Sequence, residues 1–213
     1  MIPLPALTLF VLDMPAMRGS HAIFPGLYFA VVADKSARNF RGGQILESVD
    51  GWETYDVIAN VAKLATAGIC RWLSESDLEV NLFRGELHAC KMAHLDLGKN
   101  RAMVGPELVA FQDAVLDDGE RMYQVTVPRR GLRGSPRTVG NDWHPFVLLD
   151  QDVIYHELTG EVGLERQYKA LCSGQRIEST DAVKITPSGR NAQGFRWLWE
   201  GQGYGGTGGD SYA

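Results

Sequence analysis

The final twenty residues, 194–213, place the strongest constraint on the fold, because they offer almost nothing to a packed core. Six of the nine residues from 201 to 209 are glycine. Glycine loses more backbone entropy on ordering than any other residue and brings no side chain to bury in return. The sequence therefore predicts one folded domain over residues 1–193. It predicts that 194–213 form an extended arm, which a neighbouring subunit or a bound polymer would hold in place.

The arm also carries aromatic side chains, three of them at alternate positions before the glycines. Its candidate contact residues are Phe195, Arg196, Trp197, Trp199, Tyr204 and Tyr212. Aromatic residues in such a pattern anchor protein interfaces, stack on nucleic-acid bases or pack into the chain's own core. The sequence leaves these three readings open, and we expect the arm to be an interface element.

Composition places the rest of the chain among globular proteins. Apolar residues make up 45% of the sequence and the formal net charge is −5. That charge lies in residues 1–128, so residues 129–213 are relatively basic. They are not basic enough to predict nucleic-acid binding from charge alone.

The cysteines and the N-terminal residues indicate in which cellular compartment the protein is expected. Cys70, Cys90 and Cys172 form no CxxC pair, which is typical of a reducing compartment. The apolar N-terminus lacks a basic region and is interrupted by prolines, so it predicts a first strand and not a signal peptide. No apolar run approaches 18 residues, so we expect no membrane span. The expected location is the cytoplasm, or a particle assembled there.

Hydrophobic periodicity predicts an α+β fold, a single domain with a mainly antiparallel sheet and two or three helices. Alternating or short apolar runs predict strands at 7–12, 26–33, 78–82, 121–127, 146–149, 153–155 and 182–186. Helical spacing and capping signals predict helices at 50–65, 106–116 and 161–171. Asp150-Gln151-Asp152 is expected to join two of the strands as a hairpin.

The arginine loop, residues 128–137, is the clearest candidate binding element. It carries Arg129, Arg130, Arg133 and Arg137 between glycines and prolines. Guanidinium groups on such a loop contact phosphates without reading base sequence, or meet acidic groups of a partner subunit. A loop that is merely solvated is the third reading.

Catalytic and metal signals are weak. If the chain is an enzyme, His144 is the expected acid–base group, with Asp142 and His156 as further candidates near the arginine loop. His88, Cys90, His94 and Asp96 lie close together in sequence, but a structural zinc site needs a second pair of ligands. We therefore predict no catalytic residues, no metal and no cofactor.

The sequence accordingly predicts a non-catalytic subunit of a larger assembly, such as a virion or tail-type structural protein or a ribonucleoprotein component. It would dock on other protein subunits, as a homo- or hetero-oligomer, through the arm and the arginine loop. The alternative is a nucleic-acid-binding or nuclease-like protein that contacts the nucleic-acid backbone through residues 129–137 and uses His144.

Overall fold

The computed structural model describes residues 5–33, 40–51, 53–117 and 122–192. Within these residues the protein is built almost entirely of antiparallel strands. Helical structure is confined to short pieces such as α1 (Met92–Asp96) and the 3-10 turns η1 (Gly19–Ala22), η2 (Leu132–Gly134) and η3 (Ile177–Ser179). The expected α+β class is therefore wrong.

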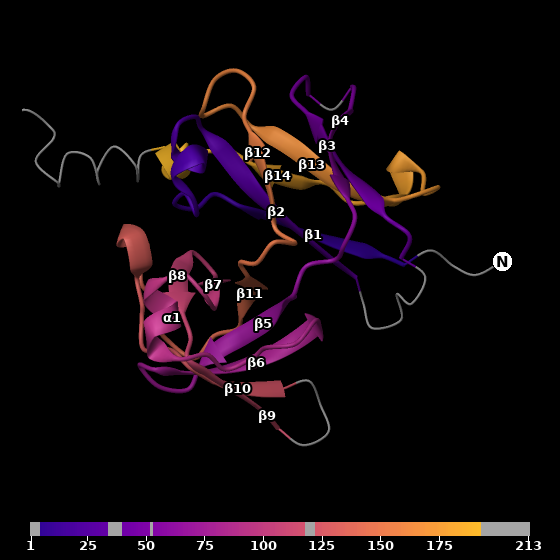
Figure 1. The fold of residues 1–213 in the computed structure, drawn as a ribbon. Helices are drawn as coiled ribbons and strands as arrows, with labels where there is room; N and C mark the ends of the chain where they lie inside the picture. Colours follow the sequence, from indigo (N-terminus) through magenta and orange to yellow (C-terminus); the bar gives the residue numbers. More distant parts are fainter. Residues whose placement is uncertain (1–4, 34–39, 52, 118–121, 193–213) are drawn as a thin grey trace, which may run out of the picture.

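The strands form three sheets. A three-stranded sheet has the order β1-β2-β12 and a four-stranded sheet the order β14-β13-β3-β4, and both lie in the upper half of Figure 1. Their bounds are β1 (Leu7–Leu12), β2 (Gly26–Ala33), β3 (Gly43–Ser48), β4 (Asp56–Val61), β12 (Ile154–Glu157), β13 (Arg166–Cys172) and β14 (Val183–Ile185).

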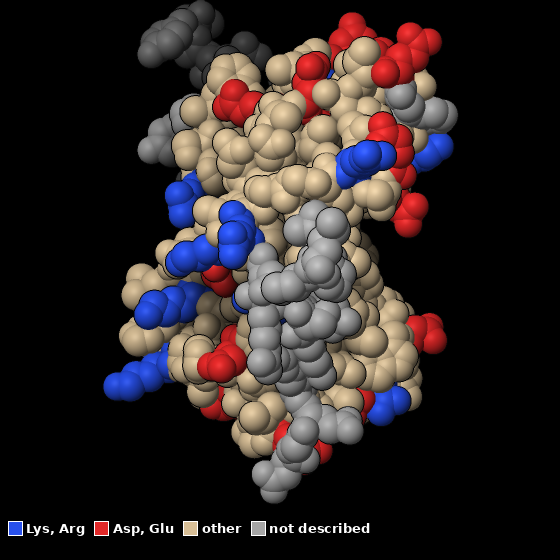
Figure 2. All heavy atoms as spheres, turned by 90° about the vertical axis from the view of Figure 1, so that its right-hand side faces the viewer, with Lys and Arg blue, Asp and Glu red and all other residues tan. Residues whose placement is uncertain are grey.

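The lower half of Figure 1 holds a seven-stranded sheet in the order β8-β7-β11-β5-β6-β10-β9. Its members are β5 (Ala67–Trp72), β6 (Asp77–Arg84), β7 (Arg101–Val104), β8 (Glu107–Ala110), β9 (Asp113–Leu116), β10 (Met122–Thr126) and β11 (His144–Leu148). The chain enters this half after β4 and leaves it after β11. Figure 2 shows the narrowing between the two halves.

Strand β2 lies between two hydrophobic cores, and each of its faces packs into a different one. Leu27, Phe29 and Val31 pack with the four-stranded sheet, whereas Tyr28 and Ala30 pack toward the seven-stranded sheet. All eight residues of β2 are buried. Burial on both faces explains why β2 is a continuous apolar run and lacks the alternation of a half-exposed strand.

The seven-stranded sheet curls around a core of its own. Ala102, Val104 and Phe146 point into this core, while Met103 and Val147, their neighbours in sequence, point toward β2. The period of two along each strand thus separates the two cores.

The helix expected at 50–65 is replaced by β4 and the connection to β5. Val57 is exposed, Val61 enters the upper core and Ala65 enters the core beneath β2, so the apolar positions face three different environments. Asp50 caps a loop: its carboxylate accepts hydrogen bonds from the Thr54 amide and hydroxyl. These bonds lower the pKa of Asp50 to about 2.

The other two expected helices are also strands. Pro106 lies in the tight turn between β7 and β8, and the segment continues into β9. The range 161–171 is a loop followed by β13. The expected hairpin around Asp150-Gln151-Asp152 is wrong as well, since β11 pairs with β5 and β7 while β12 pairs with β2.

Several strand predictions are confirmed. The structure has β1 and β2 with the predicted bounds, and β6, β10, β11, β12 and β14 overlap their predicted ranges. The arm and its candidate residues Phe195, Arg196, Trp197, Trp199, Tyr204 and Tyr212 lie outside the described residues.

Candidate docking surface beside the arginine loop

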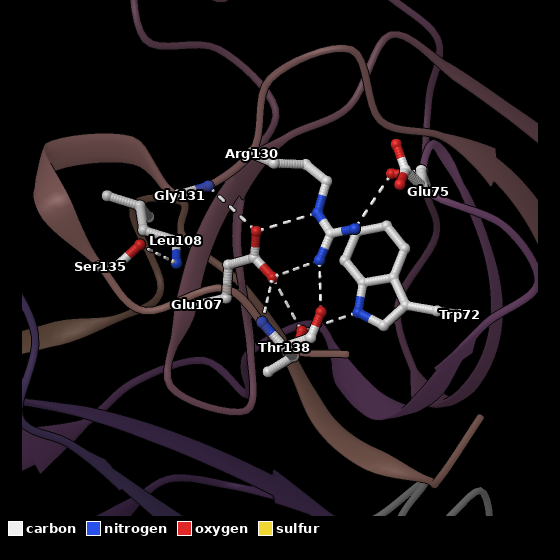
Figure 3. Close-up of polar contacts among 8 residues, drawn as sticks. All are labelled: Trp72, Glu75, Glu107, Leu108, Arg130, Gly131, Ser135 and Thr138. Atoms are coloured by element: carbon white, nitrogen blue, oxygen red, sulfur yellow. Dashed lines mark hydrogen bonds and ion pairs between the residues drawn. The ribbon is translucent and has the colours of Figure 1, made fainter. Parts of the chain in front are cut away.

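A buried carboxylate at the start of β8 organises the arginine loop. Glu107 has no solvent exposure and lies on the same strand face as Val109, which belongs to the core of the curled sheet. Its Oε1 accepts hydrogen bonds from Arg130 Nε (3.0 Å) and the Gly131 amide (3.0 Å). Its Oε2 accepts from Arg130 Nη2 (2.8 Å) and from the Thr138 amide (2.7 Å) and hydroxyl (2.8 Å). Both ends of the loop are thereby tied to one carboxylate (Figure 3).

The Arg130 guanidinium is fully engaged by this site. It stacks on Trp72 with 3.6 Å to the ring centroid, a close cation–π contact. Its remaining donors reach the carbonyl oxygens of Glu75 and Thr138. Trp72 Nε1 donates to Thr138 Oγ1 at 2.7 Å, which closes the network (Figure 3). We call Glu107, Arg130, Trp72 and Thr138 the Glu107 clamp.

The ionisation of Glu107 follows from these contacts. Burial on its own raises the pKa of Glu107, but hydrogen bonds from Arg130 and Thr138 outweigh burial and lower it. The carboxylate is therefore charged at neutral pH, as its five donors require. A bidentate pair of this kind fixes geometry as well as charge.

A groove lies directly outside the clamp. It encloses about 500 Å³ and is lined by 72–75 from the β5–β6 turn, by Arg130 and by 137–141. We call it the Trp72 groove. Arg137 is exposed at its edge and forms no ion pair within the described residues.

Exposed apolar side chains flank the groove. Leu73 is 51% exposed and Val139 is 82% exposed, and both line it. Trp143, two residues after the last lining residue Asn141, is 44% exposed and is stacked by Arg71, whose guanidinium lies 5.1 Å from the ring centroid. Tryptophan and arginine are enriched among the anchors of protein interfaces, and aliphatic side chains beside them add buried apolar area.

The structure separates the four predicted loop arginines into different roles. Arg130 is a mostly buried structural residue. Arg129 is exposed and lies 3.6 Å from Asp96 in a surface ion pair. Arg133 and Arg137 are exposed and have no ion pair among the described residues. The loop is therefore fixed by one arginine and displays three.

The candidate acid–base residues are not gathered into one site. His144 begins β11 in the seven-stranded sheet, opposite Cys70, whereas His156 lies on β12 beside Leu27 of β2. Within the described residues, His144 forms no hydrogen bond to Asp142 or His156, and its buried Nε2 atom has no partner. Asp142 is exposed.

The segment from His88 to Asp96 is a surface loop leading into α1. His88 is exposed and lies 3.9 Å from Glu86. In the described part of the chain, no three His, Cys, Asp or Glu side chains are placed to hold a metal ion together. No described helix is long and apolar enough to cross a membrane.

Sequence reasoning missed Glu107, Trp72 and Thr138, which make the clamp with Arg130. Glu107 was placed in the first turn of a helix, where an acidic residue is common. A possible signal was a lone glutamate directly before the apolar run of β8, followed by an arginine-rich loop.

A family model described as Rcc01698-like, C-terminal, matches residues 57–145 of this chain. The matched span is less than half of the sequence. It runs from β4 to the start of β11 and contains the Glu107 clamp and every lining residue of the Trp72 groove. A comparison with curated proteins gives no match.

Proposed function

We propose that this protein is a non-catalytic subunit of a larger assembly and that the Trp72 groove is one of its docking surfaces. The observation that carries the proposal is the exposure of Leu73 and Val139 beside Arg137 in a groove whose arginine loop is held by the Glu107 clamp. Exposed apolar side chains on rigid structure gain contact area in a complex without the entropic cost of ordering a mobile loop.

The arm, residues 194–213, is the second docking element of the proposal, on the strength of its composition. The kinds of assembly that we propose are those expected from the sequence: a virion or tail-type particle, or a ribonucleoprotein. Its partners would be protein subunits, identical or different.

The test is size-exclusion chromatography with light scattering on the chain purified from its native source. The wild type is expected to elute in a complex heavier than the 23.5 kDa chain. Val139→Asp should shift the protein toward 23.5 kDa because a charge would be buried at the interface. Leu97→Asp is the matched control, since Leu97 is 81% exposed on the loop after α1 and Val139 is 82% exposed.

Two outcomes contradict the proposal. One is a wild type that elutes at 23.5 kDa throughout. The other is a complex that both variants weaken equally, which would indicate a general effect of added charge. Removing residues 201–213 in the same assay tests the arm separately.

Contact with a nucleic-acid backbone is a second candidate function. It is favoured by the exposure of Arg129, Arg133 and Arg137 on one fixed loop. Its test is anisotropy with labelled DNA and RNA over a salt series, in which log affinity should fall linearly with log salt concentration. Absence of binding at low salt eliminates it.

A further inference from the structure

The end of the described chain is fixed against the loop that joins η1 to β2. Asn191 is fully buried, and its side-chain amide donates to the carbonyl oxygens of His21 (2.5 Å) and Phe24 (2.8 Å). Its Oδ1 accepts from the Gly26 amide at 2.9 Å. Figure 1 shows the yellow turn at the end of the described chain beside the indigo coil of η1. The arm, residues 194–213, therefore begins three residues after a side chain that is locked beside Phe24.

Asp13 holds the residues just before Asn191. Its carboxylate accepts hydrogen bonds from the backbone amides of Ser188 (2.6 Å) and Arg190 (3.3 Å). The backbone of this turn has thus already lost its conformational freedom in the folded protein. The entropic cost of ordering the residues that follow it is lower than for a chain end that starts from mobile backbone.

Apolar side chains lie beside this turn. Ile23 is 62% exposed, Phe24 is 56% exposed and Val162 is 38% exposed. Gly189 separates Val162 from Pro25: a side chain at position 189 would place its Cβ atom 3.5 Å from both Cγ atoms of Val162 and 3.8 Å from Pro25 Cβ. These four apolar residues form one surface around the turn, and we call Ile23, Phe24, Pro25 and Val162 the Phe24 patch.

The aromatic segment of the arm, residues 195–199, is tethered next to this patch. Adjoining exposed apolar residues mark a contact surface, and the length of the chain decides between its possible occupants. Phe195 follows Asn191 by four residues, which an extended chain spans in at most about 14 Å, and Trp199 lies within about 28 Å. A segment on so short a tether meets the patch at an effective concentration of about millimolar, which favours it over a separate molecule.

The sequence of the aromatic segment suits an extended conformation on an apolar surface. Aromatic residues occupy every second position, and the residues between and after them are Arg196, Leu198 and Glu200. In a strand, this alternation places the three rings on one face and both charged side chains on the other. One face can then be buried without burying a charge.

We propose that the aromatic segment packs on the Phe24 patch of its own chain. Burial of its rings against Phe24 and Val162 supplies the free energy that the glycine-rich residues 201–213 cannot supply. Those residues then project from the patch and are the part of the arm left for a partner subunit. The inference concerns the single chain and uses none of the residues that line the Trp72 groove.

The test is a double-mutant cycle in the full chain, read as the melting temperature by calorimetry. One variant is Phe24→Ser, and the arm variant combines Phe195→Ser, Trp197→Ser and Trp199→Ser. Each should lower the melting temperature by about 3–6 °C. Their combination should lower it no further than either alone, because both break the same contact. The matched control is Leu116→Ser on β9, where Leu116 is 55% exposed, and its effect should add to that of the arm variant.

Fluorine NMR of protein labelled with fluorotryptophan gives a readout that does not depend on stability. The resonances of Trp197 and Trp199 are assigned with Trp197→Phe and Trp199→Phe. Both resonances should shift in Phe24→Ser, because the rings lose a neighbour, and both should stay unchanged in Leu116→Ser.

Three results overturn the proposal. The first is a cycle in which the effects of Phe24→Ser and the arm variant add. The second is that neither fluorine resonance responds to Phe24→Ser. The third is a melting temperature that rises with protein concentration in the wild type but not in Phe24→Ser, which would place a second copy on the patch. Repeating the cycle in the Val139→Asp variant separates these results from a failure of the proposed function.

Discussion

Each half of the molecule contains a buried Glu–Arg pair. The polar atoms of the two pairs differ greatly in how many of them have hydrogen-bond partners. In the lower half, Glu107 accepts five hydrogen bonds and Arg130 stacks on Trp72. In the upper half, Glu47 Oε1 accepts from Arg166 Nη1 and the Tyr168 hydroxyl, each at 2.7 Å. Nearby, Arg166 Nε and His156 Nε2 are buried without a hydrogen-bond partner among the described residues.

The difference reflects what each pair holds. The Glu107 clamp ties a surface loop to a strand and draws on backbone amides of that loop, which only a fixed loop conformation can supply. The Glu47 pair joins strands β3 and β13, whose backbone groups are already used by sheet pairing. The lower pair therefore fixes a loop through its carboxylate. In the upper pair only Arg166 reaches a loop, at the carbonyl oxygens of Thr159 and Glu161, and Glu47 mainly neutralises the arginine.

The largest effect is expected for Glu107→Gln. The change leaves the Arg130 charge buried without a counter-ion, which should lower the free energy of unfolding by about 3–5 kcal/mol. Urea unfolding followed by tryptophan fluorescence measures it. A loss below about 1 kcal/mol would show that the clamp is solvated and would remove the contrast between the halves.

Glu47→Gln should cost less, about 1–3 kcal/mol, because Glu47 accepts hydrogen bonds from two side chains whereas Glu107 accepts five, two of them from loop amides. Arg166 would still donate to the carbonyl oxygens of Thr159 and Glu161. The same urea assay applies, with Glu157→Gln at an exposed position as the control. A cost equal to or greater than that of Glu107→Gln would reverse the comparison.

Trp72→Phe should destabilise the protein by about 1–2 kcal/mol. The variant keeps an aromatic ring but loses the hydrogen bond to Thr138 and weakens the cation–π contact with Arg130. Trp143→Phe, at an exposed position, is the matched control and should leave stability nearly unchanged. Equal effects from the two variants would contradict a role for Trp72 in the clamp.

The smallest effect on the free energy of unfolding is expected from mild acid. It should come from two histidines in the upper half, His21 and His156. Burial lowers the pKa values of both His21 and His156, so the unfolded chain takes up protons more readily than the folded one. Stability should fall as pH drops from about 7.5 to 5.5, through the unfolded histidine pKa of about 6.5. The pKa of Glu107 is lowered, so its contribution should persist there and be lost only below the unfolded carboxyl range. Urea midpoints over pH test this, and His156→Gln should flatten the slope.

The sequence predicted strands well where a whole apolar run packs as one strand. It predicted helices wrongly where successive apolar residues pack into different cores. The bounds of β1 and β2 were predictable because the apolar runs begin just after Pro5 and Pro25 and end at Asp13 and Asp34. Val61 and Ala65 have helical spacing, yet they enter different cores, which no local pattern reveals. Pro106 resembles a helix start because a tight turn after a strand uses the same residue.

The candidate site was predictable only in part. The arginine loop was found from its composition, but local sequence cannot show that Arg130 pairs with a glutamate 23 residues earlier. Nor can it show that Trp72, 66 residues before Thr138, closes the same network. Such contacts depend on the order of strands in the sheet, which the sequence did not establish.

The most direct test of the central claim, that Glu107 fixes the arginine loop, is hydrogen exchange at single-residue resolution. The amides of Gly131 and Thr138 donate to Glu107 in the folded protein. In the wild type, the amides of Gly131 and Thr138 should exchange slowly, whereas the exposed Gly140 amide should exchange fast. In Glu107→Gln, the Gly131 and Thr138 amides should both lose their protection. Exchange at Gly131 and Thr138 as fast as at Gly140 in the wild type would contradict the central claim.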